Sequence, residues 1–467
     1  MARDSPATEG RTKGVSAEAT DGVADPSAGR ATPDPAELLR SRSYLVLLVF
    51  GAVVGVLAAV VAFFFLKAVG EVQHYVFTSL PQDVGFSGEP IWWPLPWLAL
   101  AGLIVALTIH YLPGTAGHKP AEGFKTGSPV QPIELPGIVL ASFATLSLGV
   151  VLGPEAPLIA IGSGLGVLTV WLVKRDAPAT AIAVIGGAGS FAAISTLLGS
   201  PIVGAFLLME AAGIGGAILG VVLVPGLLAA GIGSLIFVGL DSWTGFGTMS
   251  LAIPQIPEAG SPRGAEFLWA IGIGVAAAIV GNAIRRLALA MQPIVERRIV
   301  LLTPVVGLVV GGLAIAFEKA TGRSSSQVLF SGQSDLAPVI HNAASWSIGA
   351  LTLLMACKAL AYGASLSSFR GGPIFPAMFI GAVGGIALSH APGLPMIAGV
   401  GMGIGAMAVA MLGLPLTSVL LATVFLQADA LDLMPLVIVA VVVSYVTSAR
   451  LAPPPSPTPS DASPASA

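Results

Sequence analysis

The chain has 467 residues, of which 55% are hydrophobic and only 10% carry a charge. Its mean hydropathy is +0.90. These values exclude a soluble domain of this length and predict an all-α polytopic membrane protein in a lipid bilayer. The net charge of −3 decides little, but the single cysteine, Cys357, excludes an internal disulfide and a cysteine metal cluster. We expect no metal, no cofactor and no nucleic-acid partner.

The two ends of the chain differ from its middle. Residues 1–40 are rich in Ala, Pro, Asp, Ser, Gly and Arg, which predicts a disordered tail. The first apolar run, Tyr44 to Val69, is too long for the core of a signal peptide. Arg40 and Arg42 precede this run, so the positive-inside rule places the N-terminal tail in the cytoplasm. Residues 451–467 form a second disordered tail, rich in Pro and Ser.

Between the tails we expect one transmembrane domain over residues 41–450. Several of its apolar segments are shorter than the roughly 20 residues that span a bilayer, and many contain some of the 58 glycines and 36 prolines of the chain. Short, interrupted segments are typical of broken helices that meet at a buried site. The predicted segments lie near 43–69, 92–112, 133–153, 155–173, 180–198, 201–239, 264–290, 299–320, 344–367, 374–390, 395–412, 414–428 and 432–449.

Glu155 is the only ionisable residue between Glu134 and Lys174. A carboxylate at membrane depth costs roughly 2.5–3.5 kcal/mol on insertion scales, so one that is retained usually has a function. Pro157 favours the first turn of a helix, which places Glu155 at a helix start. Unpaired N–H groups and the positive end of the helix dipole bind anions there. We therefore predict that Glu155 is a gate that competes with a permeating anion.

The sequence around Glu155 is repeated in the second half of the chain. Gly-Pro-Glu-Ala-Pro at 153–157 recurs as Gly-Pro-Ile-Phe-Pro at 372–376, and both copies fit G-P-x-x-P-x-x-x-I-G. Downstream, G-x-G at 187–189 and G-x-P at 199–201 recur at 401–403 and 413–415. The two pairs of motifs occur in the same order. Their copies are 219 and 214 residues apart, a difference that one short loop can accommodate. This predicts two equivalent repeats, about 41–240 and 264–450.

In each copy, two prolines bracket two residues that keep their N–H groups. If a pseudo-two-fold axis relates the repeats, both helix starts face one point, where backbone amides bind a dehydrated anion. The alternative is that both motifs are simple helix breaks at packing contacts. The predicted anion-binding residues are Gly153, Glu155, Ala156, Gly372, Ile374 and Phe375.

These motifs resemble those of the CLC family of chloride channels and proton/chloride antiporters. The family's Gly-Arg/Lys-Glu-Gly-Pro is similar to residues 153–157, its Gly-x-Phe-x-Pro to residues 372–376, and its Asn-Ala-Pro-Leu-Ala-Gly to residues 199–204, which lead to Glu210. The resemblance extends over residues 43–449. It implies two inverted-topology repeats, a homodimer in the cell membrane, one chloride pathway per subunit, and Glu155 as the external gating glutamate.

The chain also departs from the family pattern. The family's Gly-Ser-Gly-Ile-Pro is not recognisable; the nearest stretch, residues 117–123, has no hydroxyl at the expected place. Pro154 replaces a basic residue, and Pro373 removes an amide that the family keeps. The inner proton-transfer carboxylate of the antiporters falls at Ala211. The last apolar segment resembles the family's penultimate helix, and Tyr445 does not match the tyrosine of its final helix.

Three further charged residues lie in or beside apolar segments. Glu210 is the only ionisable residue between Asp176 and Asp241, and it either relays protons or joins two helices by hydrogen bonding. Lys358 and Arg370 flank the second motif. They either attract anions or extend to the membrane interface.

The function expected from the residues is therefore a chloride channel or transporter, with a proton-coupled halide antiporter as the alternative. An intramembrane enzyme needs a Ser–His pair, paired Asp residues or H-E-x-x-H, and no apolar segment carries any of these. A transporter for larger organic anions needs basic residues in its central motifs, and these motifs have none.

Overall fold

The computed structural model describes residues 39–124, 128–213, 218–245, 262–427 and 430–452. Regular structure in these ranges is helical, and nine of the described helices are long and apolar enough to cross a membrane. Both tails, 1–40 and 451–467, fall almost wholly outside the described residues, so their expected disorder stays a prediction.

Two sets of helices follow one another along the chain. The first set comprises α2 (Arg42–His74), α4 (Pro94–Tyr111), α5 (Leu135–Ser147), α6 (Glu155–Val173), α7 (Ala179–Leu198), α8 (Pro201–Ala212) and α9 (Ile218–Thr244). The second set comprises α10 (Gly264–Glu296), α11 (Ile299–Thr321), α12 (Gln333–His341), α13 (Ile348–Ser368), α14 (Ile374–Ser389), α15 (Met396–Leu412), α16 (Pro415–Leu426) and α17 (Ala430–Leu451). The short helix α3 (Leu80–Asp83) lies between α2 and α4.

One predicted segment is wrong in its boundaries. Residues 201–239 were expected to form one segment, but α8 ends at Ala212 and α9 begins at Ile218. The physical reason is Gly213, whose φ of 60° is left-handed and ends α8. The sequence pattern missed this because the apolar character continues on both sides of the break.

The two sets pack in the same way. In the first, α6 contacts α7, α2 contacts α9, and α8 follows α7; in the second, α14 contacts α15, α10 contacts α17, and α16 follows α15. The repeated glycines occupy equivalent contacts. A Cβ on Gly162 would collide with the carbonyl of Gly189, and one on Gly381 would collide with the carbonyl of Gly403. Only glycine lets these helix backbones approach so closely.

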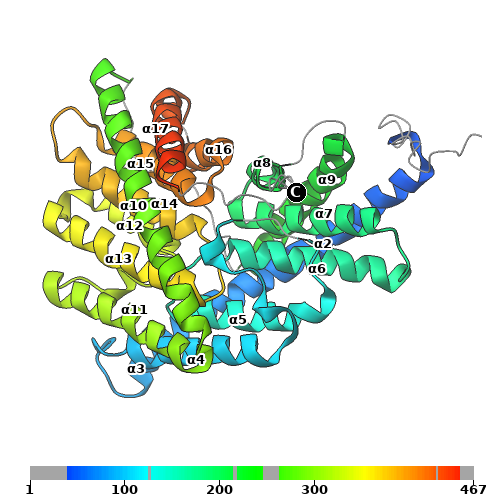
Figure 1. Ribbon diagram of the computed structural model, residues 1–467, viewed down its shortest axis with the longest axis horizontal. Coiled ribbons are helices and arrows are strands. Elements are labelled where there is room, and N and C mark those ends of the chain that lie inside the picture. The colour runs from blue at the N-terminus through cyan, green and yellow to red at the C-terminus, as the bar shows by residue number, and fades with distance from the viewer. Residues whose placement is uncertain (1–38, 125–127, 214–217, 246–261, 428–429, 453–467) are drawn as a thin grey trace, which may run out of the picture.

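The relation between the sets is inverted. Equivalent helices α4 and α11 contact each other, with Gly102 against Pro304 and Gly307 against Leu98, so they run antiparallel. The equivalent helices α8 and α16 also meet, at the boundary between the two sets in Figure 1. A two-fold axis perpendicular to these helices reverses their direction, which is the geometry of inverted-topology repeats. The predicted fold class is confirmed.

Candidate functional site

The two repeated motifs lie side by side. Gly153 donates its N–H to the carbonyl of Gly372 at 2.8 Å, and Gly372 donates to the carbonyl of Gly153 at 2.6 Å. Helix α6 begins at Glu155 and α14 begins at Ile374, each just after this pair of hydrogen bonds. The starts of α6 and α14 therefore face a common point, as the repeat predicted. Pro154 and Pro373 directly precede the two helices.

Glu155 bridges the two repeats. Its side chain is 0% exposed, and its Oε1 accepts a hydrogen bond from the N–H of Phe375 at 2.8 Å. The carboxylate of one repeat thus occupies the start of the helix in the other. Among the described residues, Oε2 of Glu155 has no hydrogen-bond partner.

The predicted anion-binding residues divide into two groups. Ala156, Ile374 and Phe375 occupy the first turns of the two helices, and Ile374 and Phe375 are fully buried. The N–H groups of Gly153 and Gly372 each donate to the carbonyl of the other glycine, so these two residues hold the helix starts side by side. A Cβ on Gly372 would collide with Oε2 of Glu155. The absence of a side chain at Gly372 is therefore what admits the carboxylate.

Two polar residues of the site were not found from the sequence. Tyr362 on α13 is fully buried, and its hydroxyl donates to the carbonyl of Pro373 at 2.9 Å. Ser365, also on α13, accepts a hydrogen bond from the N–H of Val151 at 3.4 Å. The available signal was weak: a tyrosine and a serine in an apolar segment before the second motif. Tyr445, in contrast, is 43% exposed on α17.

A cavity of about 430 Å³ reaches the site. Its lining includes Ala156, Gly371 and Pro373, and also His118 and Leu208. The loop at 117–123, which stands where the family has Gly-Ser-Gly-Ile-Pro, therefore borders a space that opens onto the starts of α6 and α14. Its volume is large enough to hold water molecules.

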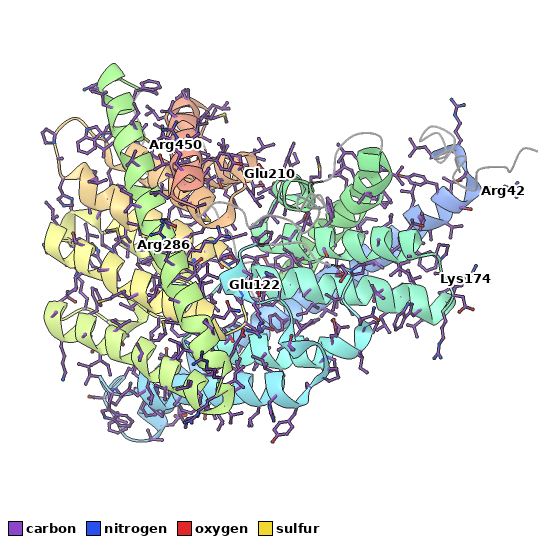
Figure 2. The ribbon with its side chains drawn as sticks, in the orientation of Figure 1. Arg42, Glu122, Lys174, Glu210, Arg286 and Arg450 are labelled. Carbon is purple, nitrogen blue, oxygen red and sulfur yellow. The ribbon has the colours of Figure 1, made fainter. Side chains whose placement is uncertain are left out.

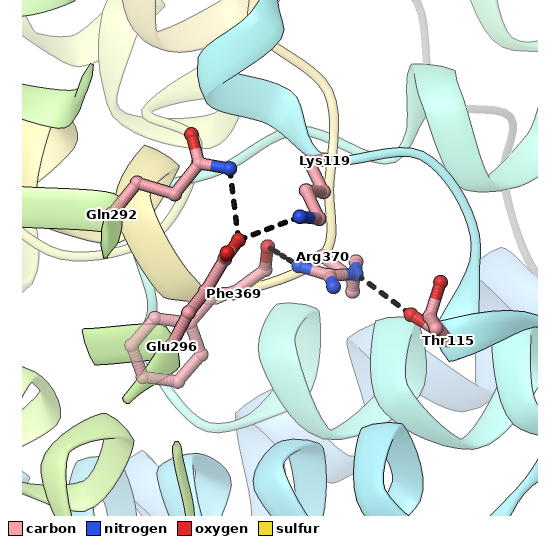
Figure 3. Close-up of polar contacts among 6 residues, drawn as sticks. All are labelled: Thr115, Lys119, Gln292, Glu296, Phe369 and Arg370. Carbon is pink, nitrogen blue, oxygen red and sulfur yellow. Dashed lines mark hydrogen bonds and ion pairs between the residues drawn. The ribbon is translucent and has the colours of Figure 1, made fainter. Parts of the chain in front are cut away.

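Arg370 immediately precedes the bridge between the motifs and does not extend to a membrane interface. It is 6% exposed, and its Nε donates to the carbonyl of Thr115 at 3.2 Å. Close by, Lys119 pairs with Glu296 at 2.7 Å, and Gln292 donates to the same carboxylate at 2.9 Å (Figure 3). Arg370 thus ties the loop that borders the cavity to the second motif. Burial and hydrogen bonds to the backbone carbonyls of Thr115 and Phe369 speak against the interfacial alternative.

Glu210 lies at the junction of α8 and α16 (Figure 2). Its Oε1 accepts from the N–H of Leu416 at 3.0 Å, and its Oε2 accepts from the N–H of Thr417 at 2.8 Å and from the Thr417 hydroxyl at 2.6 Å. These groups belong to the first turn of α16, so Glu210 caps that helix across the two repeats. Both oxygens have partners, which favours the structural alternative over a proton relay.

Lys358 also remains inside the protein. It lies on α13, is 0% exposed, and donates hydrogen bonds to backbone carbonyls at 327–329. Of the two alternatives for Lys358, burial speaks against extension to the membrane interface.

The sequence profile with the description voltage gated chloride channel matches residues 101–449. Among individual relatives, the chain is 30% identical over 362 residues to YfeO of Salmonella newport (strain SL254), whose name assigns it to ion transport. The alignment covers 76% of this chain and 84% of that protein. YfeO of Salmonella typhimurium (strain LT2) gives the same values.

Solved structures share the fold. A slow cyanobacterial Cl⁻/H⁺ antiporter has a TM-score of 0.69 at 20% identity, covering 88% of this chain and 95% of the other. A CLC-type fluoride/proton antiporter has a TM-score of 0.67 at 18% identity, covering 87% and 96%. A profile that matches most of the chain, relatives at 30% identity and a shared inverted-repeat fold agree: the chain belongs to the voltage gated chloride channel (CLC) family, a family of membrane channels and transporters.

Proposed function

We propose that this protein moves chloride or a related small anion across the membrane through the point where α6 and α14 begin, with Glu155 as its gate. The observation that carries the proposal is the hydrogen bond from the N–H of Phe375 to Oε1 of Glu155. An amide at a helix start is a binding group for an anion, and here a carboxylate of the same protein uses it.

The mechanism follows from competition for the same amides. While the Glu155 carboxylate stays at the start of α14, it excludes an anion from the N–H of Phe375. When the carboxylate takes up a proton or swings away, the N–H groups of Ala156, Ile374 and Phe375 become available to a dehydrated anion. Binding by dipoles rather than by a full positive charge lets the ion leave again. Gly153 and Gly372 hold the two helix starts together throughout.

Proton-coupled exchange of chloride or another halide is the second candidate. It is favoured by the descriptions of two solved structures of the same fold as a Cl⁻/H⁺ antiporter and a fluoride/proton antiporter. The residues on the inner side of the pathway argue against tight coupling of proton and anion movement. Ala211 carries no ionisable group, and the adjacent Glu210 caps α16. We therefore expect weak or absent coupling.

The test is simultaneous recording of anion and proton flux in proteoliposomes. We expect chloride flux that rises as external pH falls, and a pH-independent flux in Glu155→Gln. Uphill proton movement driven by a chloride gradient at clamped potential, lost in Glu155→Ala, would establish the exchanger instead. A wild-type protein without flux of any halide would refute both candidates.

We further propose a homodimer in the plasma or inner membrane, with a cytoplasmic N-terminus, one pathway in each subunit, and disordered tails at 1–40 and 451–467. Arg40, before α2, and Arg42, its first residue, support this orientation. Cross-linking in mild detergent is expected to trap a two-subunit species. A fully active protein that is solely monomeric would exclude the dimer.

A further inference from the structure

Lys358 places its amino group inside the protein, with a side chain that is 0% exposed. Its Nζ donates to the carbonyl oxygens of Gln327 at 3.0 Å, Val328 at 3.2 Å and Leu329 at 2.9 Å. These three bonds use all three hydrogens of an ammonium group. Nζ also lies 4.3 Å from the centroid of the Phe379 ring. This arrangement can retain an ammonium in a buried place, because oxygen atoms and the ring face surround the charge.

The same contacts fix the ammonium near the anion site. Phe379 lies on α14 four residues after Phe375, which corresponds to about 6 Å of helix rise. On α13, Tyr362 lies one turn beyond Lys358, and its hydroxyl bonds to Pro373 at the start of α14. The face of α13 that carries Lys358 and Tyr362 therefore lies along the first two turns of α14. The ammonium is roughly 10 Å from the start of α14.

The segment that holds Lys358 is also attached to the first motif. The N–H of Phe330 donates to the carbonyl of Gly149 at 3.2 Å, four residues before Gly153. The Phe330 ring contacts that of Phe77, in the π-helical turn Tyr75–Ser79 that follows α2, with centroids 5.0 Å apart. The position of the charge relative to both helix starts is thus set by contacts from both repeats.

The ionisable groups that face this region are few. Asp335, in the first turn of α12, interacts electrostatically with Lys358, and Tyr362 on α13 interacts with Glu155. The backbone carbonyls around Lys358 are dipoles without net charge, so they orient the ammonium, and the group that could offset its charge is the carboxylate of Asp335. The energy between two charges falls only as the inverse of their distance and grows as the dielectric constant falls, so such a charge acts on groups it does not touch.

We propose that Lys358 is the internal counter-charge of the anion site, stabilising whichever negative charge, the Glu155 carboxylate or a permeating small anion, stands at the start of α14. This inference rests on the proposed function. It assigns to a residue outside the two motifs the positive charge that the motifs themselves lack. Lys358 is on this account a positioning charge that acts through space, without touching the anion.

Three substitutions separate charge from hydrogen bonding. Lys358→Arg keeps the charge, Lys358→Gln keeps N–H donors for the carbonyls at 327–329 but removes the charge, and Lys358→Met removes both. Each variant is purified, checked for a monodisperse elution profile, and reconstituted beside the wild type. The readouts are the external pH of half-maximal chloride flux and the chloride concentration that half-saturates binding by calorimetry.

If Lys358 acts as a counter-charge, Lys358→Gln and Lys358→Met should behave alike, and Lys358→Arg should behave as the wild type. Without the positive charge, the Glu155 carboxylate takes up its proton more readily, so the half-maximal pH rises by about one unit. Chloride binding weakens about tenfold for the same reason, and it weakens in the Glu155→Gln background as well.

Other outcomes overturn the inference. Lys358→Gln and Lys358→Arg could both keep the wild-type pH of half-maximal flux and chloride affinity, while Lys358→Met alone differs or fails to fold. In that case Lys358 serves only as a hydrogen-bond donor. If folded Lys358→Gln keeps the wild-type pH and affinity, the charge has no effect on the site, although wild-type flux would leave the proposed function intact. A wild type that neither moves nor binds chloride refutes the proposed function itself.

Discussion

Glu155 and Phe375, which belong to different repeats, are joined by a hydrogen bond of 2.8 Å from the backbone N–H of Phe375 to Oε1 of Glu155. The contact places the only buried carboxylate of the first motif at the start of the helix that follows the second motif. It links the sequence repeat to a gating mechanism, because an anion and a carboxylate compete for one amide.

Replacing Glu155 by glutamine is expected to abolish the pH dependence of flux. A neutral amide side chain mimics the protonated carboxyl group and loses the competition with an anion at all pH values. Chloride flux measured between acidic and neutral external pH should be flat and at or above the wild-type acid level. An unchanged wild-type profile in Glu155→Gln would contradict the gate.

Gly372→Ala is expected to displace the gate without removing it. The new Cβ would collide with Oε2 of Glu155 and lie 3.0 Å from the N–H nitrogen of Ala156. Flux near neutral pH should therefore rise, or the site should close to anions altogether, and the pH dependence should weaken. Gly384→Ala on the same helix is the matched control, because its Cβ meets only Met355 Sδ at 3.4 Å. Identical pH profiles in the two variants would show that Gly372 does not shape the gate.

Glu210→Ala is expected to destabilise the junction of α8 and α16. It removes the acceptor of three hydrogen bonds at a helix start, which costs about 1–2 kcal/mol of stability. Glu210→Gln should retain part of that stability. Thermal unfolding in detergent measures the loss, and proton recording in liposomes separates it from a relay. Loss of proton movement in a normally stable Glu210→Gln would make Glu210 a relay.

The stability of the protein is expected to fall as pH rises through a window set by Glu89, in the segment between α3 and α4. Burial, together with the negative charge of Glu318, raises the pKa of Glu89 to about 7. In the unfolded chain the carboxyl group ionises at about pH 4.3. Between these values the folded state keeps a proton that the unfolded state has released, so raising the pH favours unfolding.

Melting temperatures of wild type and Glu89→Gln, measured across this window, test the sign. The advantage of Glu89→Gln over wild type should grow from the acid end of the window to neutral pH. Glu318→Gln should narrow the window, since it removes one of the two causes. A constant difference between wild type and Glu89→Gln at every pH would contradict the assignment.

The sequence by itself determined the membrane class, the two repeats, and the starts of α6 and α14 beside Glu155. It could do so because these features depend on composition and on signals a few residues long: prolines before a helix, spaced glycines, and one carboxylate in an apolar run. It also fixed the equivalence of Gly162 with Gly381, since close helix packing leaves glycine as the only residue that fits.

The tertiary structure alone decided which groups meet at the site. Tyr362 with Pro373, Glu210 with Thr417, and Lys358 with the carbonyls at 327–329 are contacts between segments whose local sequences carry no mark of each other. For this reason the sequence left two alternatives open for Lys358 and Arg370. A charged side chain follows whichever oxygen atoms the folded chain brings within reach, and that depends on how the two repeats dock rather than on the residues beside it.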